Sequence, residues 1–197
     1  WTTDLSGLRP HQIANKGMVR TFQLTKSLAK MTVIDNMLLG AAEQKGESLR
    51  NALLPSRWQK QEKEILEKAE ELLERFKLSH MRDEYAATLS GGQRKLLEMA
   101  RALMSEPKLI LLDEPMAGVN PVLVESLLVH IENLRDEGVS VLFIEHDMDA
   151  IMGISDWIVV LAEGQVIAEG TPSDVSKNPA VIDAYLGSAI AEELKDV

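Results

Sequence analysis

The sequence contains no cysteine, which excludes a disulfide scaffold, thiolate chemistry and a cysteine zinc site. It also has no apolar run of about 18 residues, the length at which a transmembrane helix is suspected. Residues Trp1 to Asp4 lack a basic stretch followed by an apolar one, so we expect no signal peptide there. Together these absences suit a cytoplasmic protein that does not itself span a membrane.

Basic residues are fewer than acidic ones. The chain has 21 lysines and arginines against 31 aspartates and glutamates, which gives a net charge of −10. Proteins whose main partner is a nucleic acid carry a basic footprint, so we expect no nucleic-acid partner. The 197 residues, 45% of them hydrophobic and 26% charged, are enough for one globular core or a core with a small subdomain.

A glycine pair opens an apolar helix in the middle of the chain. Residues 89–93 read LSGGQ, and the apolar helix is expected over residues 95–104. Ser90 can cap this helix, and Gln93, three residues later, can complete a capping box. The unpaired N–H groups and the positive end of the helix dipole form an anion site, which the glycines allow a phosphate to approach.

A short aliphatic run follows and ends in two adjacent carboxylates. Residues 109–112 have the pattern of a buried parallel strand, and Asp113, Glu114 and Pro115 come directly after them. Neighbouring side chains on a strand alternate in direction, so the two carboxylates should point to opposite sides. One of them can hold a hydrated Mg²⁺, and the other can take a proton from water.

These motifs, in this order, resemble the ATP-binding subunit of an ABC transporter. LSGGQ is followed by LILLDEP at residues 109–115 and by Glu145-His146-Asp147 after another apolar strand, and the resemblance covers nearly the whole chain. It implies an α/β fold: an incomplete P-loop NTPase (RecA-like) ABC ATPase core with a mostly helical subdomain. The plainer alternative is an ordinary α/β domain with a capped helix and an acidic strand end.

The resemblance also implies three regions. Residues 1–27 would be a remnant of the N-terminal ATPase core with the start of the Q-loop, and residues 28–106 a helical subdomain ending in the signature helix. Residues 107–197 would be the C-terminal ATPase core with the Walker B, D-loop and H-loop segments. In the family, the helical subdomain meets the membrane-spanning partner, and we expect that contact within residues 24–40.

The resemblance assigns roles in binding and hydrolysing Mg-ATP. Glu114 would act as general base, and Asp113 would hold Mg²⁺ through water. Gln23 would position the metal and the attacking water, although taken alone it is an ordinary loop glutamine. His146 would contact the γ-phosphate. The residues that would serve the nucleotide held by a second subunit are Ser90, Gly91, Gly92 and Gln93.

Capping signals and periodicity predict the remaining elements. We expect helices over residues 5–17, 33–43, 58–78, from 121 to near 138, from 172, and 179–187. We expect strands over residues 18–22 and 139–144, and a hairpin of strands 158–161 and 165–168. Asn120 can cap the helix that begins at Pro121. It stands where the family's D-loop usually carries aspartate, which puts in doubt any role for a negative charge there. The histidines expected to be structural are His11, His80 and His130.

The phosphate-holding loop of such ATPases, G-x-x-x-x-G-K-[ST], has no match in the 197 residues. In the family this loop lies upstream of the Q-loop, in a part that would precede Trp1. We therefore expect a family member without its N-terminal portion, which alone binds ATP poorly and hydrolyses it negligibly. The strand before the loop is expected beside residues 109–112, so its loss should expose an apolar strand edge there.

The partners implied by the resemblance are a second ATPase subunit, identical or different, and integral membrane permease subunits. These would hold the protein peripherally at the cytoplasmic face of the inner or plasma membrane. Residues 20–23, 114–121, 145–149 and 182–187 are most similar to importers of branched-chain amino acids. One alternative is a non-transport ABC ATPase, although the coiled-coil insertions or tandem cassettes usual in those proteins are missing. Another is a non-enzymatic interaction module, which the missing loop favours.

Overall fold

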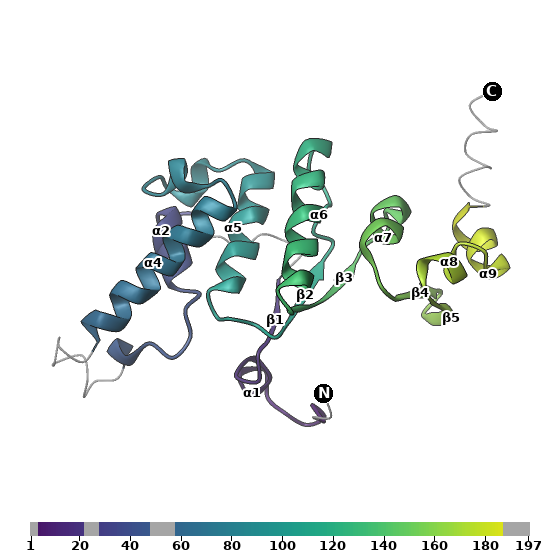
Figure 1. The fold of residues 1–197 in the computed structure, drawn as a ribbon, viewed down its shortest axis with the longest axis horizontal. Helices are drawn as coiled ribbons and strands as arrows, with labels where there is room; N and C mark the ends of the chain where they lie inside the picture. The colour runs from purple at the N-terminus through teal and green to yellow at the C-terminus, as the bar shows by residue number, and fades with distance from the viewer. Residues whose placement is uncertain (1–3, 22–27, 48–57, 187–197) are drawn as a thin grey trace. The chain divides into compact units, whose positions relative to one another are not determined.

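A computed structural model describes residues 4–21, 28–47 and 58–186 of the chain (Figure 1). It divides into two compact units, Trp1–Ile144 and Glu145–Val197. Each unit has its own sheet, three-stranded in the first and two-stranded in the second. No helix in the described ranges is long and apolar enough to cross a membrane.

The sheet of the first unit is parallel, with β1 (Met18–Arg20), β2 (Leu109–Asp113) and β3 (Ser140–Ile144) in the order β1-β2-β3. The middle strand is the aliphatic run, whose Ile110 and Leu112 are buried. The prediction of an exposed edge at this strand is wrong, because β1 and β3 pair with its two sides. Among the described residues the edge strands of this sheet are β1 and β3, and Leu142 and Ile144 of β3 are exposed.

The helices of the first unit follow the predicted order. They are α1 (Pro10–Ala14), α2 (Val33–Leu38), α4 (Gln59–Arg75), α5 (Gly91–Leu103) and α6 (Pro121–Asp136). The 3-10 turns between them in the described residues are Lys45–Glu47, Ser79–Met81 and Ala86–Thr88. Helices α2, α4 and α5 pack on one another, and α6 packs on β3 (Figure 1). Their shared interior is apolar and includes Val33, Met37, Leu73, Phe76 and Leu97.

In the first unit, helices α1 and α2 fall furthest short of the ranges predicted for them. α1 covers only the middle of the range 5–17, and α2 ends at Leu38 rather than at residue 43. The early end of α2 coincides with a close approach to α5. A Cβ added at Gly40 would lie 2.4 Å from the carbonyl oxygen of Arg101, so only glycine fits there without a shift. The spacing of apolar residues in the sequence does not reveal that two helices approach each other so closely at Gly40.

Asn36 of α2 is completely buried and binds the backbone of the segment before its own helix. Its side-chain oxygen accepts a hydrogen bond from the N–H of Leu28 at 2.8 Å. Its amide nitrogen donates to the carbonyl oxygens of Leu28, Met31 and Thr32 at 3.2, 3.4 and 2.8 Å. One side chain therefore fixes the path of residues 28–32 against α2.

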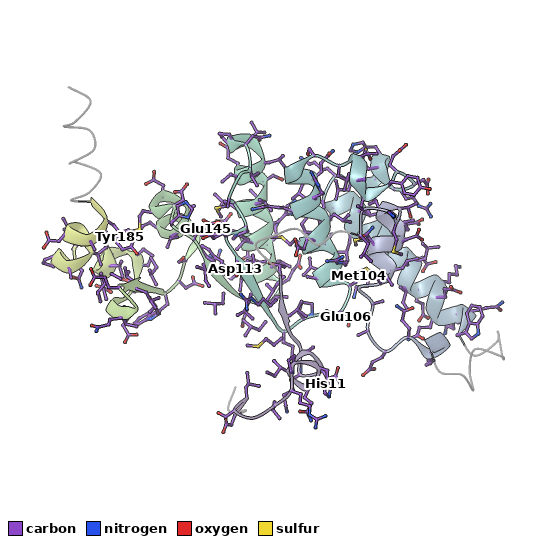
Figure 2. The ribbon with its side chains drawn as sticks, turned by 180° about the vertical axis from the view of Figure 1, so that it is seen from behind. His11, Met104, Glu106, Asp113, Glu145 and Tyr185 are labelled. Carbon is purple, nitrogen blue, oxygen red and sulfur yellow. The ribbon has the colours of Figure 1, made fainter. Side chains whose placement is uncertain are left out.

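The second unit contains α7 (Met148–Ile154), a hairpin of β4 (Ile158–Ala162) and β5 (Gln165–Gly170), and α8 (Pro172–Val175). The predicted hairpin is confirmed, with Gly164 in its turn at φ 77°. The helix predicted over residues 179–187 is instead α9 (Pro179–Val181) followed by a π-helical turn (Ile182–Leu186). The hydroxyl of Tyr185 donates to the carbonyl oxygen of Leu161 at 2.8 Å and ties this turn to β4 (Figure 2).

His130 lies in the interior of the first unit, as expected of a structural histidine. It is 7% exposed and stacks on Phe76 with ring centroids 4.2 Å apart, which joins α6 to the end of α4. Its Nδ1 is buried without a hydrogen-bond partner in the described structure. Burial, and then the charges of Arg75 and Lys77, lower the pKa of His130 below the usual value.

This lowered pKa predicts a pH dependence of stability. Above a pH of about 6.5, His130 is neutral in both the folded and the unfolded state, and its contribution to stability is fully present. Below that pH the unfolded chain binds a proton at His130 before the folded chain does. Stability therefore falls progressively until the pH reaches the pKa of His130 in the folded state. We expect His130→Phe, which keeps an aromatic ring on Phe76, to reduce the loss of unfolding free energy between pH 7 and 5.5 by up to about 1 kcal/mol.

Urea unfolding at the two pH values measures this effect. Replacement of the exposed His80 by phenylalanine is the control and should leave the pH dependence as it is in the parent chain. An equal loss of stability in the parent chain and in His130→Phe would show that His130 does not titrate as its burial predicts.

Candidate functional site

The two adjacent carboxylates lie at the C-terminal end of β2, the middle strand. Asp113 is the last residue of the strand, and its side chain is 24% exposed. Arg20, at the end of the neighbouring strand β1, donates a hydrogen bond from Nη2 to Oδ2 of Asp113 at 2.8 Å. The carboxylate of Asp113 is therefore held in place by a cation from the next strand.

The backbone of Glu114 leaves the strand in a left-handed conformation, with φ 45°. Its N–H donates to the carbonyl oxygen of Ile144 at 3.0 Å. Its own carbonyl oxygen accepts hydrogen bonds from the ammonium group of Lys95 at 2.9 Å and from the N–H of Ala117 at 3.2 Å. The direction of the Glu114 side chain is thus set by this turn, and not by strand alternation alone as predicted.

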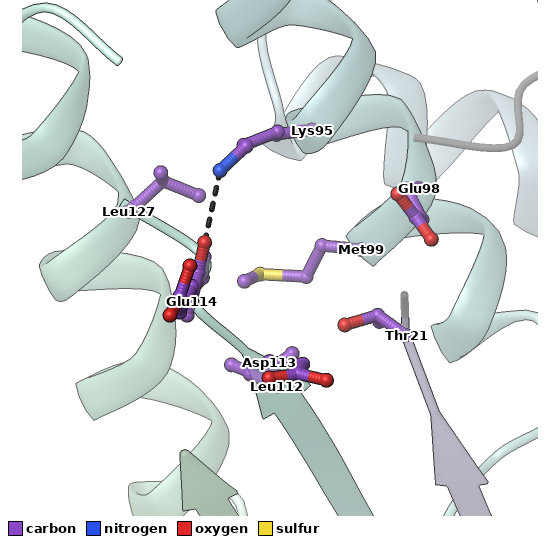
Figure 3. A pocket seen from close by; sticks show the side chains of 9 residues that line it. Thr21, Lys95, Glu98, Met99, Leu112, Asp113, Glu114 and Leu127 are labelled. Atoms are coloured by element: carbon purple, nitrogen blue, oxygen red, sulfur yellow. Dashed lines mark hydrogen bonds between the residues drawn. The ribbon is translucent and has the colours of Figure 1, made fainter. Parts of the chain in front are cut away.

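A small cavity of about 20 Å³ lies between α5 and the end of β2. That volume is enough for about one water molecule, so a nucleotide could be bound only on the open side of this region. Figure 3 shows the Lys95 side chain reaching down from α5 to the Glu114 backbone. The other residues that line the cavity are Thr21, Glu98, Met99, Leu112, Asp113, Glu114, Pro115 and Leu127.

The glycine pair begins α5 as predicted. The N–H of Gln93 donates to Oγ of Ser90 at 3.2 Å, and the N–H of Ser90 donates to Oε1 of Gln93 at 2.9 Å, so the predicted capping box is confirmed. The two glycines have different surroundings. A Cβ at Gly92 would lie 2.6 Å from Cδ1 of Leu123, whereas a Cβ at Gly91 would meet nothing within 4 Å. A side chain at Gly92 would therefore require Leu123 to shift, while the open space over Gly91 is available to a ligand.

For two predicted site residues the structure gives no position relative to these carboxylates. Gln23 lies outside the described residues. His146 belongs to the second unit, where its side chain is 75% exposed and its Nδ1 lies 3.8 Å from Oε2 of Glu145. The N–H of His146 donates to the same oxygen at 3.3 Å. Next to it, Asp147 caps α7 by accepting a hydrogen bond from the N–H of Ala150 at 3.1 Å.

The donor set suits magnesium better than a protein-caged metal. Among the described residues no group of three histidines, cysteines or carboxylates could hold a metal ion. Mg²⁺ usually keeps several waters and is bound by one or two carboxylates together with substrate phosphates. Asp113, a carboxylate at a strand end that is about one quarter exposed, fits that chemistry.

Sequence reasoning missed Arg20 and Lys95. The Arg20–Asp113 contact spans 93 positions, so no local pattern could reveal it. For Lys95 there was a signal. It lies four residues before Met99, which is buried toward β2, and positions four apart share one face of a helix.

Comparison with known proteins places this geometry in a family. A family described as "ABC transporter" matches residues 2–117, and one described as "Branched-chain amino acid ATP-binding cassette transporter" matches residues 165–191. The chain belongs to the family of ABC-transporter ATP-binding proteins. Members of this family are ATPases, and the resemblance inferred from the sequence is confirmed.

Several relatives of this ABC ATPase carry informative names. A protein of Archaeoglobus fulgidus named "Probable branched-chain amino acid transport ATP-binding protein LivG" is 48% identical over 96% of this chain and 73% of its own length. "High-affinity branched-chain amino acid transport ATP-binding protein BraF" of Pseudomonas aeruginosa is 41% identical over 94% of this chain and 74% of its own length. The corresponding LivG of Escherichia coli is 42% identical over 94% of this chain and 73% of its own length.

Solved structures agree on the fold. An ATP-binding cassette of an ABC transporter crystallised without nucleotide has a TM-score of 0.75 at 41% identity and covers 93% of this chain and 74% of its own. A cassette in an ADP conformation has a TM-score of 0.76 at 41% identity and covers 94% and 74%. The predicted fold class, an α/β ABC ATPase core with helices beside it, is confirmed.

Proposed function

We propose that this ABC ATPase drives an importer for branched-chain amino acids. The observation that carries the proposal is the set of relatives, each 41% to 48% identical over most of the chain and each named for branched-chain amino acid transport. The family match at residues 165–191 supports the same branch. No residue of this subunit is assigned to the transported solute itself.

In this proposal Mg-ATP lies between two ATPase subunits arranged head to tail. Asp113 holds hydrated Mg²⁺, and Glu114 takes a proton from the attacking water. Gln23 positions that water and the metal, and His146 contacts the γ-phosphate. The metal supplies charge neutralisation of the phosphates. The residues assigned to the nucleotide of the opposite subunit are Ser90, Gly91, Gly92 and Gln93, and the open space over Gly91 supports that assignment.

The partners proposed are a second ATPase subunit and integral membrane permease subunits, which keep the protein at the cytoplasmic face of the membrane. Contact with the permease is assigned to residues 24–40, a range that overlaps the start of the helical region 28–106. The division into regions 1–27, 28–106 and 107–197 stays a prediction. The described part of the contact region is the segment that Asn36 fixes and helix α2.

Uptake of radiolabelled leucine tests the transport function. The complete gene would be expressed with its neighbouring permease and binding-protein genes in a host that lacks branched-chain amino-acid uptake. We expect uptake that depends on this ATPase gene and that excess isoleucine or valine abolishes. Uptake of leucine that is unchanged when the ATPase gene is omitted would contradict the proposal.

Nucleotide binding by the 197-residue polypeptide tests a separate prediction. Because the sequence has no match to the phosphate-holding loop, we expect no binding of a fluorescent ATP analogue up to millimolar concentration, with or without Mg²⁺. Tight binding that depends on Mg²⁺ would mean that another segment of these residues holds the phosphates. If this prediction fails, the leucine uptake experiment still tests the transport function by itself.

A further inference from the structure

Helix α5 contacts the proposed site at two places. Its first turn carries the Ser90–Gln93 capping box, and two residues further on the Lys95 side chain turns toward β2. The ammonium group of Lys95 donates to the carbonyl oxygen of Glu114 at 2.9 Å (Figure 3). The turn assigned to the opposite subunit's nucleotide is thus joined directly to the peptide of the proposed general base.

The acceptor of this hydrogen bond is a backbone group in an uncommon conformation. A non-glycine residue with positive φ persists when its surroundings fix it from several sides. For Glu114, β3 fixes the N–H through Ile144, the following turn fixes the carbonyl oxygen through Ala117, and α5 fixes the same oxygen through Lys95. Lys95 supplies the only one of these three contacts made by a side chain.

We propose that Lys95 is a positioning residue that couples the first turn of α5 to Glu114. A hydrogen bond from a charged donor is stronger than one between neutral groups, and here it sets the peptide from which the carboxylate of the base projects. Binding of the opposite subunit's nucleotide to residues 90–93 would then change the position of Glu114 through the Lys95 hydrogen bond. The inference rests on the proposed function, because it gives Glu114 the role of base.

The same helix offers a matched control at its other end. Lys68 of α4 donates from its ammonium group to the carbonyl oxygen of Met104 at 3.2 Å and to Oε1 of Glu106 at 2.7 Å. Both acceptors follow the C-terminal end of α5, as Figure 2 shows. Lys68 therefore makes the same kind of contact with the same helix, away from the carboxylates of β2.

Steady-state ATPase kinetics of a transporter assembled from the complete gene and its permease genes test the coupling, because the 197-residue chain alone is expected to bind no nucleotide. We expect Lys95→Met to lower kcat about ten-fold while the KM for Mg-ATP changes less than about two-fold, because only placement of the base is disturbed. Lys95→Arg, which keeps a charged donor, should recover kcat to within about three-fold of the parent. Lys68→Met should leave kcat within about two-fold. An unchanged kcat in Lys95→Met, or an equal fall in Lys68→Met, would overturn the proposal.

Amide hydrogen exchange on the 197-residue chain gives a readout that does not need ATPase activity. Lys95→Met should accelerate exchange at Ala117, whose N–H shares the Glu114 acceptor, and at the first turn of α5. Lys68→Met should instead accelerate exchange at Met104. If the parent transporter hydrolyses no ATP, the proposed function fails, and the exchange rate at Ala117 still decides whether Lys95 holds Glu114. Unchanged exchange at Ala117 would overturn the proposal.

Discussion

Replacing Glu114 by glutamine should lower the ATPase kcat of the assembled transporter at least about 100-fold, the range in which a positioned general base contributes. Glutamine has nearly the same size and shape but cannot accept a proton from water. Its main-chain carbonyl still accepts from Lys95, so the local structure should be retained. The KM for Mg-ATP should stay within about three-fold, because the carboxylate is assigned to the chemical step. Kinetics of ATP hydrolysis by the purified transporter provide the measurement.

Glu163→Gln is the matched control for this experiment. Glu163 is also a glutamate in the left-handed region, with φ 49°, but it lies in the turn between β4 and β5. We expect its replacement to leave kcat unchanged. A Glu114→Gln variant with more than about a tenth of the parent rate would mean that another group takes the proton.

Replacing Asn36 by leucine should destabilise the folded chain by about 3 kcal/mol, the largest stability effect we expect from a single substitution in α2. Leucine has the same branched arrangement of heavy atoms, although it is larger, and it can make none of the four hydrogen bonds to Leu28, Met31 and Thr32. The backbone N–H and carbonyl groups would lose a protein partner where the side chain is fully buried. Urea unfolding of the 197-residue chain, followed by circular dichroism, measures the difference.

Two further variants show whether hydrogen bonding is the cause. Asn133, on α6, is exposed, and Asn133→Leu should change stability by less than about 0.5 kcal/mol. Asn36→Asp keeps an oxygen that can accept from the N–H of Leu28, but it places a second oxygen where the amide nitrogen donates to the carbonyl oxygen of Thr32. Because two acceptors then face each other, this variant should destabilise the folded chain at least as strongly as Asn36→Leu at neutral pH. A stability of Asn36→Leu equal to that of the parent would show that water replaces these hydrogen bonds at no cost.

The features predicted well from the sequence are those fixed within a few residues. Ser90 (with Gln93) and Asn120 cap their helices as expected, because a cap depends on one side chain and the next turn. The hairpin around Gly164 has a similarly local cause. Helix α7 begins with the same kind of local signal, because Asp147 caps it by accepting from the N–H of Ala150.

The features that could not be predicted depend on contacts between distant segments. The place of β2 between two strands is a property of the whole sheet, and the exposed edge predicted for it was therefore assigned to the wrong strand. The left-handed turn at Glu114 depends on Ile144 and Lys95. Asn36 looked like an ordinary helix residue, because its partners are backbone groups that carry no sequence signature.

The Lys95 contact has a consequence for how such subunits can diverge. Its acceptor is a main-chain oxygen, which every residue type at position 114 provides. A lineage can therefore exchange the side chain at 114 and lose hydrolysis while the attachment of α5 to β2 survives. Few residue types can replace Lys95 in this contact, because only a long side chain with a terminal donor reaches that oxygen. Some transporters could contain two different ATPase subunits, one of which has become inactive. In the inactive subunit we expect substitutions at position 114 to appear before substitutions at position 95.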